Sequence, residues 1–210
     1  MLDSLKDIVK KTIPYDVLKF RRDLEARRTW EKQGRPSPPP HIVKEDLIKE
    51  YAKAFKTNVL IETGTYLGDM VYAMRKLFSR ILSFELDKTL AEQAQKRFAS
   101  EPHITIVQGD SGRLLGDHIK TINEPCLFWL DGHYSGGITA KGALITPIKN
   151  ELTHIFSHPT EGHVILIDDA RCFTGEDDYP RLEELRQFVA DRKQDWQFTM
   201  ENDVIRIHKV

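Results

Sequence analysis

From residue 41 onward, short apolar runs alternate with segments in which apolar residues recur every three or four positions. Short runs rich in β-branched residues are typical of buried strands, and the longer spacing is typical of helices with one buried face. The predicted strands span 59–62, 81–85, 104–107, 127–131, 164–168, 197–200 and 204–208. The predicted helices span 43–55, 69–78, 88–98, 112–122, 146–156 and 182–190. This order predicts an α/β fold with a doubly wound, mostly parallel seven-stranded sheet that ends in a C-terminal antiparallel hairpin.

The first forty residues have a different pattern. Residues 3–33 are predicted to be helical with a break near Pro14, and residues 34–40 are rich in proline and cannot continue a helix. The inward-facing positions expected on this helix are Val17, Leu18, Leu24 and Trp30. We therefore divide the chain into an N-terminal helical extension with a Pro-rich linker, 1–40, and a main domain, 41–210. Because the apolar positions of the extension have no place in the core of the sheet, we expect it to mediate homo-oligomerisation.

Composition excludes several partners. Lys and Arg number 31 against 32 Asp and Glu, which gives a formal net charge of -1 and no overall field to attract nucleic acid. No apolar run is long enough to span a bilayer, and the first residues lack the basic-then-apolar order of a signal peptide. The expectation is a cytoplasmic protein without a transmembrane segment.

The segment 59–70 contains the clearest ligand-binding pattern. An apolar run ends at Glu62, passes through Gly64 and Gly68, and leads directly into a helical pattern. Glycine permits backbone angles closed to other residues and lets the main chain approach a ligand. The G-x-G-x-x-G and G-K-S/T spacings are both absent, so the expected ligand has no phosphate chain.

Acidic residues follow the strands of the predicted sheet. They are Glu62, Glu85, Asp110, Asp131 and Asp168. The carboxyl ends of parallel strands form one edge, where open α/β sheets bind ligands, so we expect these acids to line a cleft. Glu85 follows Glu62 by 23 positions, close to the interval at which an acid accepts hydrogen bonds from a ribose. Asp110 and Ser111 would border the base, although the safer interpretation of Ser111 is a helix cap.

Five segments resemble the class I S-adenosylmethionine (SAM)-dependent methyltransferases, and within them the metal-dependent O-methyltransferases of the catechol and caffeoyl-CoA type. The matching segments lie at 62–68 (ETGTYLG), 84–87 (FELD), 108–111 (QGDS), 128–134 (FWLDGHY) and 165–169 (ILIDD). The resemblance covers about 41–210 and implies a Rossmann-like methyltransferase domain that binds SAM. It assigns cofactor contacts to Glu62, Gly64, Thr65, Tyr66, Gly68, Glu85, Asp110, Ser111 and Asp131.

The same resemblance implies a divalent metal, with Mg²⁺ the expected ion, held by Asp131, Asp168 and Asp169. Asp169 stands where the catechol type usually has Asn, and the Asp-Asp pair is similar to that of antibiotic sugar O-methyltransferases. The ion would acidify the acceptor hydroxyl, and His133 and Asp168 are the candidate catalytic bases. Three converging acids should repel one another, so neutralising Asp168 is expected to preserve or raise stability.

Three further residues are weaker candidates. Arg171 either binds an anionic group of the substrate or balances the local acids. Lys44 and Thr139 are candidates for cofactor or substrate contact. The expected acceptor is a hydroxyl of a small molecule or sugar; a sugar hydroxyl, a catechol-like phenol and a lipid-linked glycan are all compatible.

Two other functional classes remain open. A nicotinamide-dependent oxidoreductase would share the strand-loop-helix opening and the ribose acid, but its glycine spacing is missing. A catalytically silent nucleoside-binding module would need Glu62 and Glu85 but not three converging aspartates. Affinity for NAD or for a divalent metal separates these classes from a methyltransferase.

Overall fold

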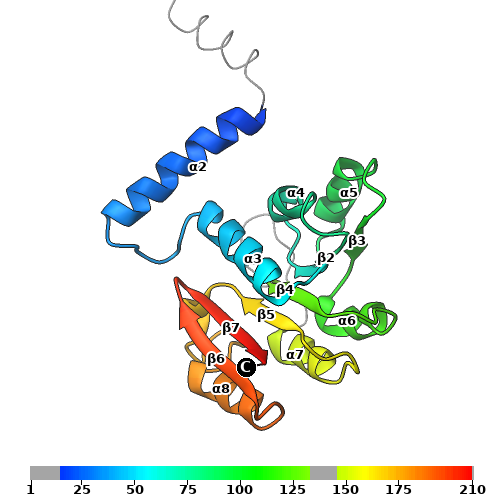
Figure 1. The fold of residues 1–210 in the computed structure, drawn as a ribbon. Helices are drawn as coiled ribbons and strands as arrows, with labels where there is room; N and C mark the ends of the chain where they lie inside the picture. The colour runs from blue at the N-terminus through cyan, green and yellow to red at the C-terminus, as the bar shows by residue number, and fades with distance from the viewer. Residues whose placement is uncertain (1–14, 133–145, 210) are drawn as a thin grey trace, which may run out of the picture.

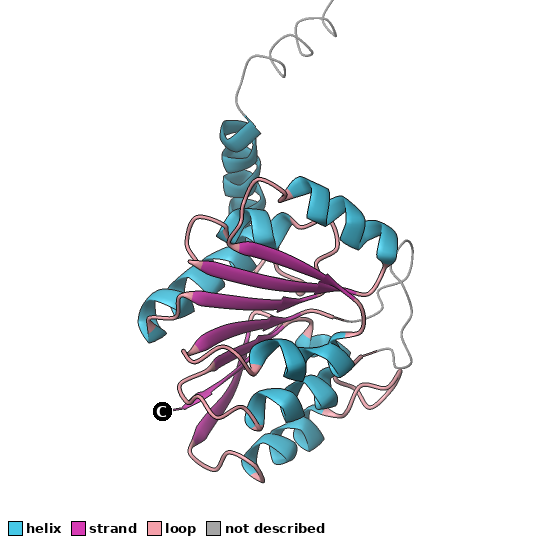
Figure 2. Ribbon diagram, turned by 90° about the vertical axis from the view of Figure 1, so that its right-hand side faces the viewer, coloured by secondary structure: helices cyan, strands magenta, loops and turns pink. Residues whose placement is uncertain are grey.

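A seven-stranded sheet forms the centre of the protein, and the computed structural model describes residues 15–132 and 146–209. Its order is β3-β2-β1-β4-β5-β7-β6, in which the first five strands are parallel and β7 pairs antiparallel with both β5 and β6. The strands are β1 (Val59–Thr63), β2 (Arg80–Glu85), β3 (Ile104–Gln108), β4 (Cys126–Leu130), β5 (Val164–Ile167), β6 (Trp196–Glu201) and β7 (Val204–Lys209). The predicted fold class and the C-terminal hairpin are confirmed (Figures 1 and 2).

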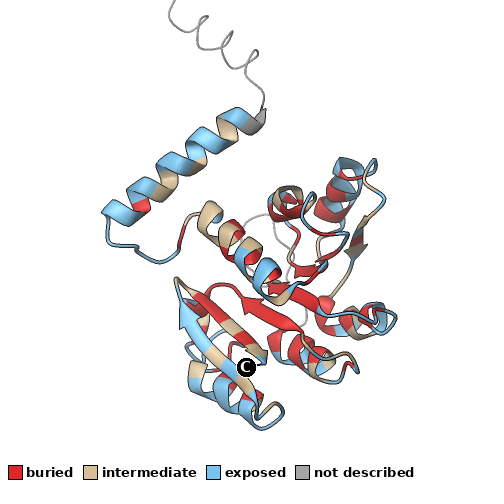
Figure 3. Ribbon diagram, in the orientation of Figure 1, coloured by how far each residue is buried: buried red, intermediate tan, exposed pale blue. Residues whose placement is uncertain are grey.

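Helices cover both faces of the sheet (Figure 2). They are α2 (Tyr15–Lys32), α3 (His41–Phe55), α4 (Asp69–Met74), α5 (Lys88–Arg97), α6 (Ser111–Ile119), α7 (Ile148–Phe156) and α8 (Leu182–Ala190), with a 3-10 turn, η1 (Ala170–Cys172). Successive strand residues point to opposite faces. Leu60 therefore joins the core under α3, α4 and α5, whereas Ile61 joins the core under α6, α7 and α8. This two-sided burial explains why the central strands are continuous apolar runs (Figure 3).

The helix α2 stands apart from the sheet and is connected to α3 by an extended segment (Figure 1). Ion pairs hold the two helices together: Lys19 Nζ lies 2.6 Å from Glu45 Oε1, and Arg27 pairs with Asp46. Hydrogen bonds from His41 and Lys19 outweigh the effect of burial and lower the pKa of Glu45 to about 2. Charged contacts therefore link α2 to α3.

The apolar positions of α2 were predicted only in part. Trp30 is buried as expected, but Val17 and Leu24 are exposed and their inward assignment is wrong. Phe20 is also exposed, so three apolar side chains at 17, 20 and 24 share one solvent-facing side of the helix. Among the residues that the structure describes, we find no helix that combines the length and the hydropathy of a bilayer-spanning segment.

Candidate functional site

The loop after β1 is held in place by neighbouring strands. The N–H groups of Gly64 and Thr65 donate to the carbonyl of Phe84 at 2.9 and 3.1 Å. Gly64 has φ 87°, and a Cβ there would lie 2.4 Å from the Asp131 carbonyl oxygen. Gly68 has φ 78° and caps α4, where a Cβ would lie 2.8 Å from the Phe98 ring. Both positions therefore require glycine, and the loop lies against the ends of β2 and β4.

Glu85, the last residue of β2, connects the loop to its neighbouring strand. Glu85 Oε2 accepts the N–H of Tyr66 at 2.7 Å, and Oε1 accepts the N–H of Asp87 at 2.9 Å. Burial raises the pKa of this carboxyl above its ordinary value, although the two N–H groups oppose the shift. A carboxylate has about four lone-pair sites, so Glu85 keeps acceptor capacity for the two hydroxyls of a ribose.

Glu62 lies beneath the loop and does not face solvent. Ser83 Oγ donates to Glu62 Oε2, and Thr65 Oγ1 lies 2.5 Å from Ser83 Oγ. Complete burial raises the pKa of Glu62 to about 8, with the charge of Glu85 adding to the effect. A chain of hydrogen bonds thus runs from the loop through Ser83 to a carboxyl that is largely protonated at neutral pH. Glu62 and Thr65 support the loop in this arrangement.

The end of β3 continues the same edge with Asp110 and Ser111. Asp110 is the N-cap of α6, because its Oδ1 accepts the N–H of Gly112 at 2.9 Å. The expectation that Ser111 caps this helix is therefore wrong. Ser111 is the first helical residue, and its Oγ donates to Glu151 Oε1 at 2.5 Å.

Glu151 was missed by the sequence analysis. It lies on α7 and is almost completely buried, and this burial raises its pKa to about 7. The sequence does contain a pattern that indicates its burial. Glu151 occurs on the same helical face as Ile148, Leu152 and Ile155, and a buried acid on such a face requires a hydrogen-bond partner.

The three predicted metal ligands lie at two neighbouring strand ends. The N–H of Asp131 donates to the Thr63 carbonyl at 3.0 Å, and the N–H of Asp168 donates to the Leu130 carbonyl at 3.0 Å. Asp168 and Asp169 are both buried, and Asp169 adopts a left-handed backbone with φ 55°. The sheet order thus brings the ends of β1, β4 and β5 together as predicted.

Two basic side chains bind the aspartate pair. Lys44 Nζ donates to Asp168 Oδ2 and lies 3.7 Å from Asp169 Oδ1. Burial lowers the pKa of Lys44, but Asp168, Asp131 and Asp169 together raise it above its ordinary value. Arg171 Nη1 donates to Asp169 Oδ1 at 2.7 Å and also bonds Asp203. These contacts support the interpretation in which Arg171 balances local acids.

In this arrangement Asp131, Asp168 and Asp169 do not form a binding site for a divalent ion. The carboxylate oxygens are suitable ligands for Mg²⁺, which prefers octahedral oxygen coordination. However, Lys44 occupies the side of Asp168 Oδ2 that such an ion would need. Across the described ranges 15–132 and 146–209, no group of three or more His, Cys, Asp or Glu side chains has a geometry that could hold a metal. His133 and Thr139, predicted to act in the loop after β4, lie outside the described residues.

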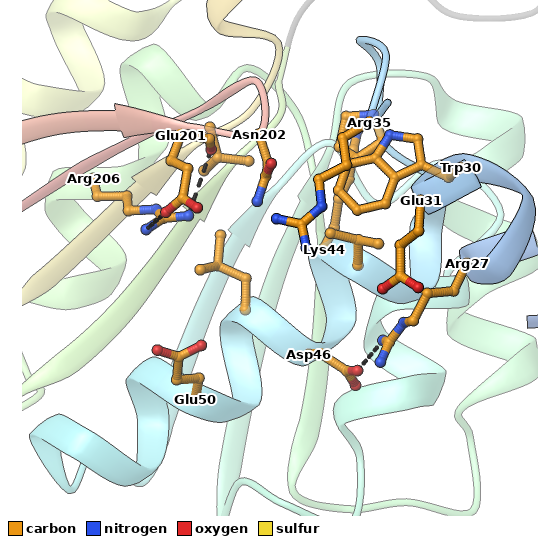
Figure 4. A pocket seen from close by; sticks show the side chains of 14 residues that line it. Arg27, Trp30, Glu31, Arg35, Lys44, Asp46, Glu50, Glu201, Asn202 and Arg206 are labelled. Carbon is orange, nitrogen blue, oxygen red and sulfur yellow. Dashed lines mark hydrogen bonds and ion pairs between the residues drawn. The ribbon is translucent and has the colours of Figure 1, made fainter. Parts of the chain in front are cut away.

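A polar cavity of about 440 Å³ opens beside Lys44, between α2, α3 and the β6–β7 turn. Figure 4 shows Arg206 bonded to Glu201 on one wall and Arg27 bonded to Asp46 on another. The charged residues that line the cavity are Arg27, Arg35, Lys44, Arg206, Glu31, Asp46, Glu50 and Glu201. Four basic side chains thus face four acidic ones, so the lining has no excess charge that would favour a polyanion.

Comparison with solved structures identifies the architecture. The O-methyltransferase TomG from Streptomyces achromogenes, involved in tomaymycin synthesis and solved with SAM, matches with TM-score 0.59 and 16% identity over 90% of this chain and 88% of its own. An O-methyltransferase from Bacillus cereus in complex with SAH matches with TM-score 0.59 and 14% identity over 96% and 94%. The SAH-bound methyltransferase PaMTH1 from Podospora anserina matches with TM-score 0.58 and 14% identity over 100% and 95%.

No protein-family model matches the sequence, and no curated protein matches it. Identities of 14–16% establish a fold and not a reaction. The order of the seven strands, the glycine loop after β1 and the structural matches lead to the same result: this chain has the fold of the class I SAM-dependent methyltransferases.

Proposed function

We propose that this protein is a SAM-dependent methyltransferase that acts on a hydroxyl of a small molecule or sugar. The observation that carries the proposal is the preformed loop 64–68, whose Tyr66 N–H is bonded to Glu85 at the end of the neighbouring strand. Two structural neighbours are O-methyltransferases solved with SAM or SAH. Both facts support a nucleoside-binding cleft of the methyltransferase kind.

The cofactor would be held by groups at the ends of β1, β2 and β3. Gly64 and Gly68 provide close approach of the main chain, Glu85 provides acceptors for ribose hydroxyls, and Asp110 and Ser111 border the base. Bound SAM would supply an electrophilic methyl group. The remaining task of the protein is to hold the acceptor oxygen in line with that group and to exclude water, and such positioning supplies a large part of a rate enhancement.

The acceptor would approach from the cavity beside Lys44. Its lining combines Arg, Lys, Asp and Glu side chains of both signs, which provide donors and acceptors for several hydroxyls. The balanced charge favours a polyhydroxylated small molecule over a nucleic acid. A sugar hydroxyl is the acceptor that this chemistry fits best.

The catalytic base stays a prediction, and the predicted metal does not fit the described side chains. His133 lies outside the described residues, and the Asp168 side chain is only 1% accessible behind Lys44. A divalent ion on Asp131, Asp168 and Asp169 would require the Lys44 ammonium to leave Asp168. A cytoplasmic location rests on the sequence alone, and homo-oligomerisation rests on the sequence and on the exposed apolar side of α2.

A reaction screen tests this proposal. The protein is incubated with trideuteromethyl-labelled SAM and a pool of hydroxylated metabolites that includes free and nucleotide-linked sugars. Mass spectrometry should detect a labelled product whose methyl group is on oxygen. Tight binding of NAD, together with no binding of SAM or SAH, would instead favour the oxidoreductase class.

A further inference from the structure

Lys44 is positioned as a fixed part of the aspartate cluster. It lies one turn into α3, the helix that packs over β4 and β5, and its side chain is only 15% accessible. Its ammonium donates to Asp168 Oδ2 and lies 3.7 Å from Asp169 Oδ1. Long lysine side chains usually extend into solvent, so a buried ammonium aimed at two carboxylates indicates a specific role.

Two oxygens of the pair also accept hydrogen bonds from other groups of the protein. Asp168 Oδ1 accepts the N–H of Asp169 at 2.8 Å, and Asp169 Oδ1 accepts a hydrogen bond from Arg171 at 2.7 Å. A Mg²⁺ ion needs oxygen ligands at roughly 2.0–2.1 Å in octahedral geometry. To reach these oxygens it would have to displace one cation and remain close to a second, and like charges at such separations repel strongly.

We propose that Lys44 is the resident cation of this site, holding Asp168 and Asp169 in place of a divalent metal and orienting the acceptor hydroxyl that enters from the adjacent cavity. An ammonium has three N–H donors, and Lys44 lines that cavity while it bonds Asp168. Asp168 then acts through Lys44 as a positioning residue. The role of Lys44 in orienting the acceptor rests on the proposed function. Its position in place of a divalent metal does not.

Titration with Mn²⁺, followed by electron paramagnetic resonance, tests the occupancy directly in the full-length protein. The variants are Lys44→Met, which removes the charge and keeps much of the side-chain length, and Lys44→Arg, which keeps the charge. Lys49→Met is the matched control, because Lys49 lies on the same helix and contacts Glu45 and Asp46 instead. Thermal melts establish that each variant is folded.

The wild-type protein, Lys44→Arg and Lys49→Met should bind Mn²⁺ only weakly. Lys44→Met should gain affinity by about tenfold or more, since the repelling charge beside the ligands is gone. One Mn²⁺ bound at micromolar concentration by the wild-type protein would overturn the inference, and this outcome does not depend on any variant folding. A folded Lys44→Met without gained affinity would also overturn it.

Titration with SAH, run in parallel, separates the two proposals. Absence of SAH binding would defeat the proposed function and leave the Mn²⁺ result to decide the role of Lys44. If SAH binds, methyl transfer by the wild-type protein should be unchanged in excess chelator. Lys44→Met should then raise the KM for the acceptor more than it changes SAH affinity.

Discussion

The main-chain N–H of Tyr66 donates to Glu85 Oε2 at 2.7 Å, which connects the glycine loop after β1 to the last residue of β2. Tyr66 has φ 49°, a left-handed conformation that is uncommon for a residue with a side chain. The bond therefore helps to hold the loop in a conformation that strains its backbone. Preorganisation of this kind reduces the ordering cost of binding.

The buried carboxyl of Glu62 predicts a pH dependence of stability. Its pKa is about 8 in the folded protein, above the ordinary value of 4.5, so folding favours the protonated form. The stability that Glu62 contributes to the folded state is fully present below about pH 4.5 and is lost as the pH rises through about 8. In Glu62→Gln that loss should be absent, so the free energy of unfolding of the variant, relative to wild type, should rise by a few kcal/mol between pH 5 and 9.

Urea denaturation at each pH measures this difference. Glu92→Gln, an exposed change on α5, is the control and should show no such trend. A constant difference between Glu62→Gln and wild type across the range would show that Glu62 titrates normally.

Glu151 should be important for stability through its hydrogen bond and not through its charge. Glu151→Ala leaves the buried Ser111 hydroxyl without its acceptor and opens a cavity, which should cost about 2–4 kcal/mol. Glu151→Gln keeps an acceptor and should cost much less. Denaturant midpoints of the two variants provide the comparison, and equal losses would contradict this account.

The sequence was sufficient for the fold because its central strands are buried on both faces, and Gly64 and Gly68 lie where the backbone has positive φ. It also located the edge of the site, since Glu85, Asp110, Asp131 and Asp168 do follow neighbouring strands. It named Lys44 only as a weaker candidate for cofactor or substrate contact and did not predict its ion pair with Asp168. Lys44 is 124 positions before Asp168, and no local pattern indicates that α3 brings the two together.

The ion pair between Lys44 and Asp168 reverses the effect on stability that the sequence predicted for Asp168→Asn. The sequence suggested repulsion among three acids, so that neutralisation would preserve or raise stability. With Lys44 bonded to Asp168, the change instead removes the negative charge nearest to a largely buried ammonium, whose remaining ion pair is the longer one to Asp169. We expect a loss of about 1–3 kcal/mol, measured by denaturation at pH 7. Unchanged or increased stability would contradict the ion pair.

The exposed apolar side of α2 predicts self-association. Val17, Phe20 and Leu24 are 42%, 63% and 37% accessible, and a second copy of the helix could cover them. Light scattering should give a mass above the monomer for the full chain and the monomer mass for Phe20→Ser or a chain beginning at His41. A monomeric full-length protein would refute this prediction.

The central claim is that the loop 64–68 and Glu85 form a SAM site, and calorimetric titration with SAH tests it most directly. Wild-type protein should bind one SAH per chain. Glu85→Gln, which replaces a carboxylate acceptor by an amide, should weaken binding by about 10- to 100-fold, because hydrogen bonds to charged groups contribute about 1.5–3 kcal/mol. Glu92→Gln should bind as tightly as wild type. Absence of binding by the wild-type protein, or unchanged affinity in a folded Glu85→Gln, would contradict the account.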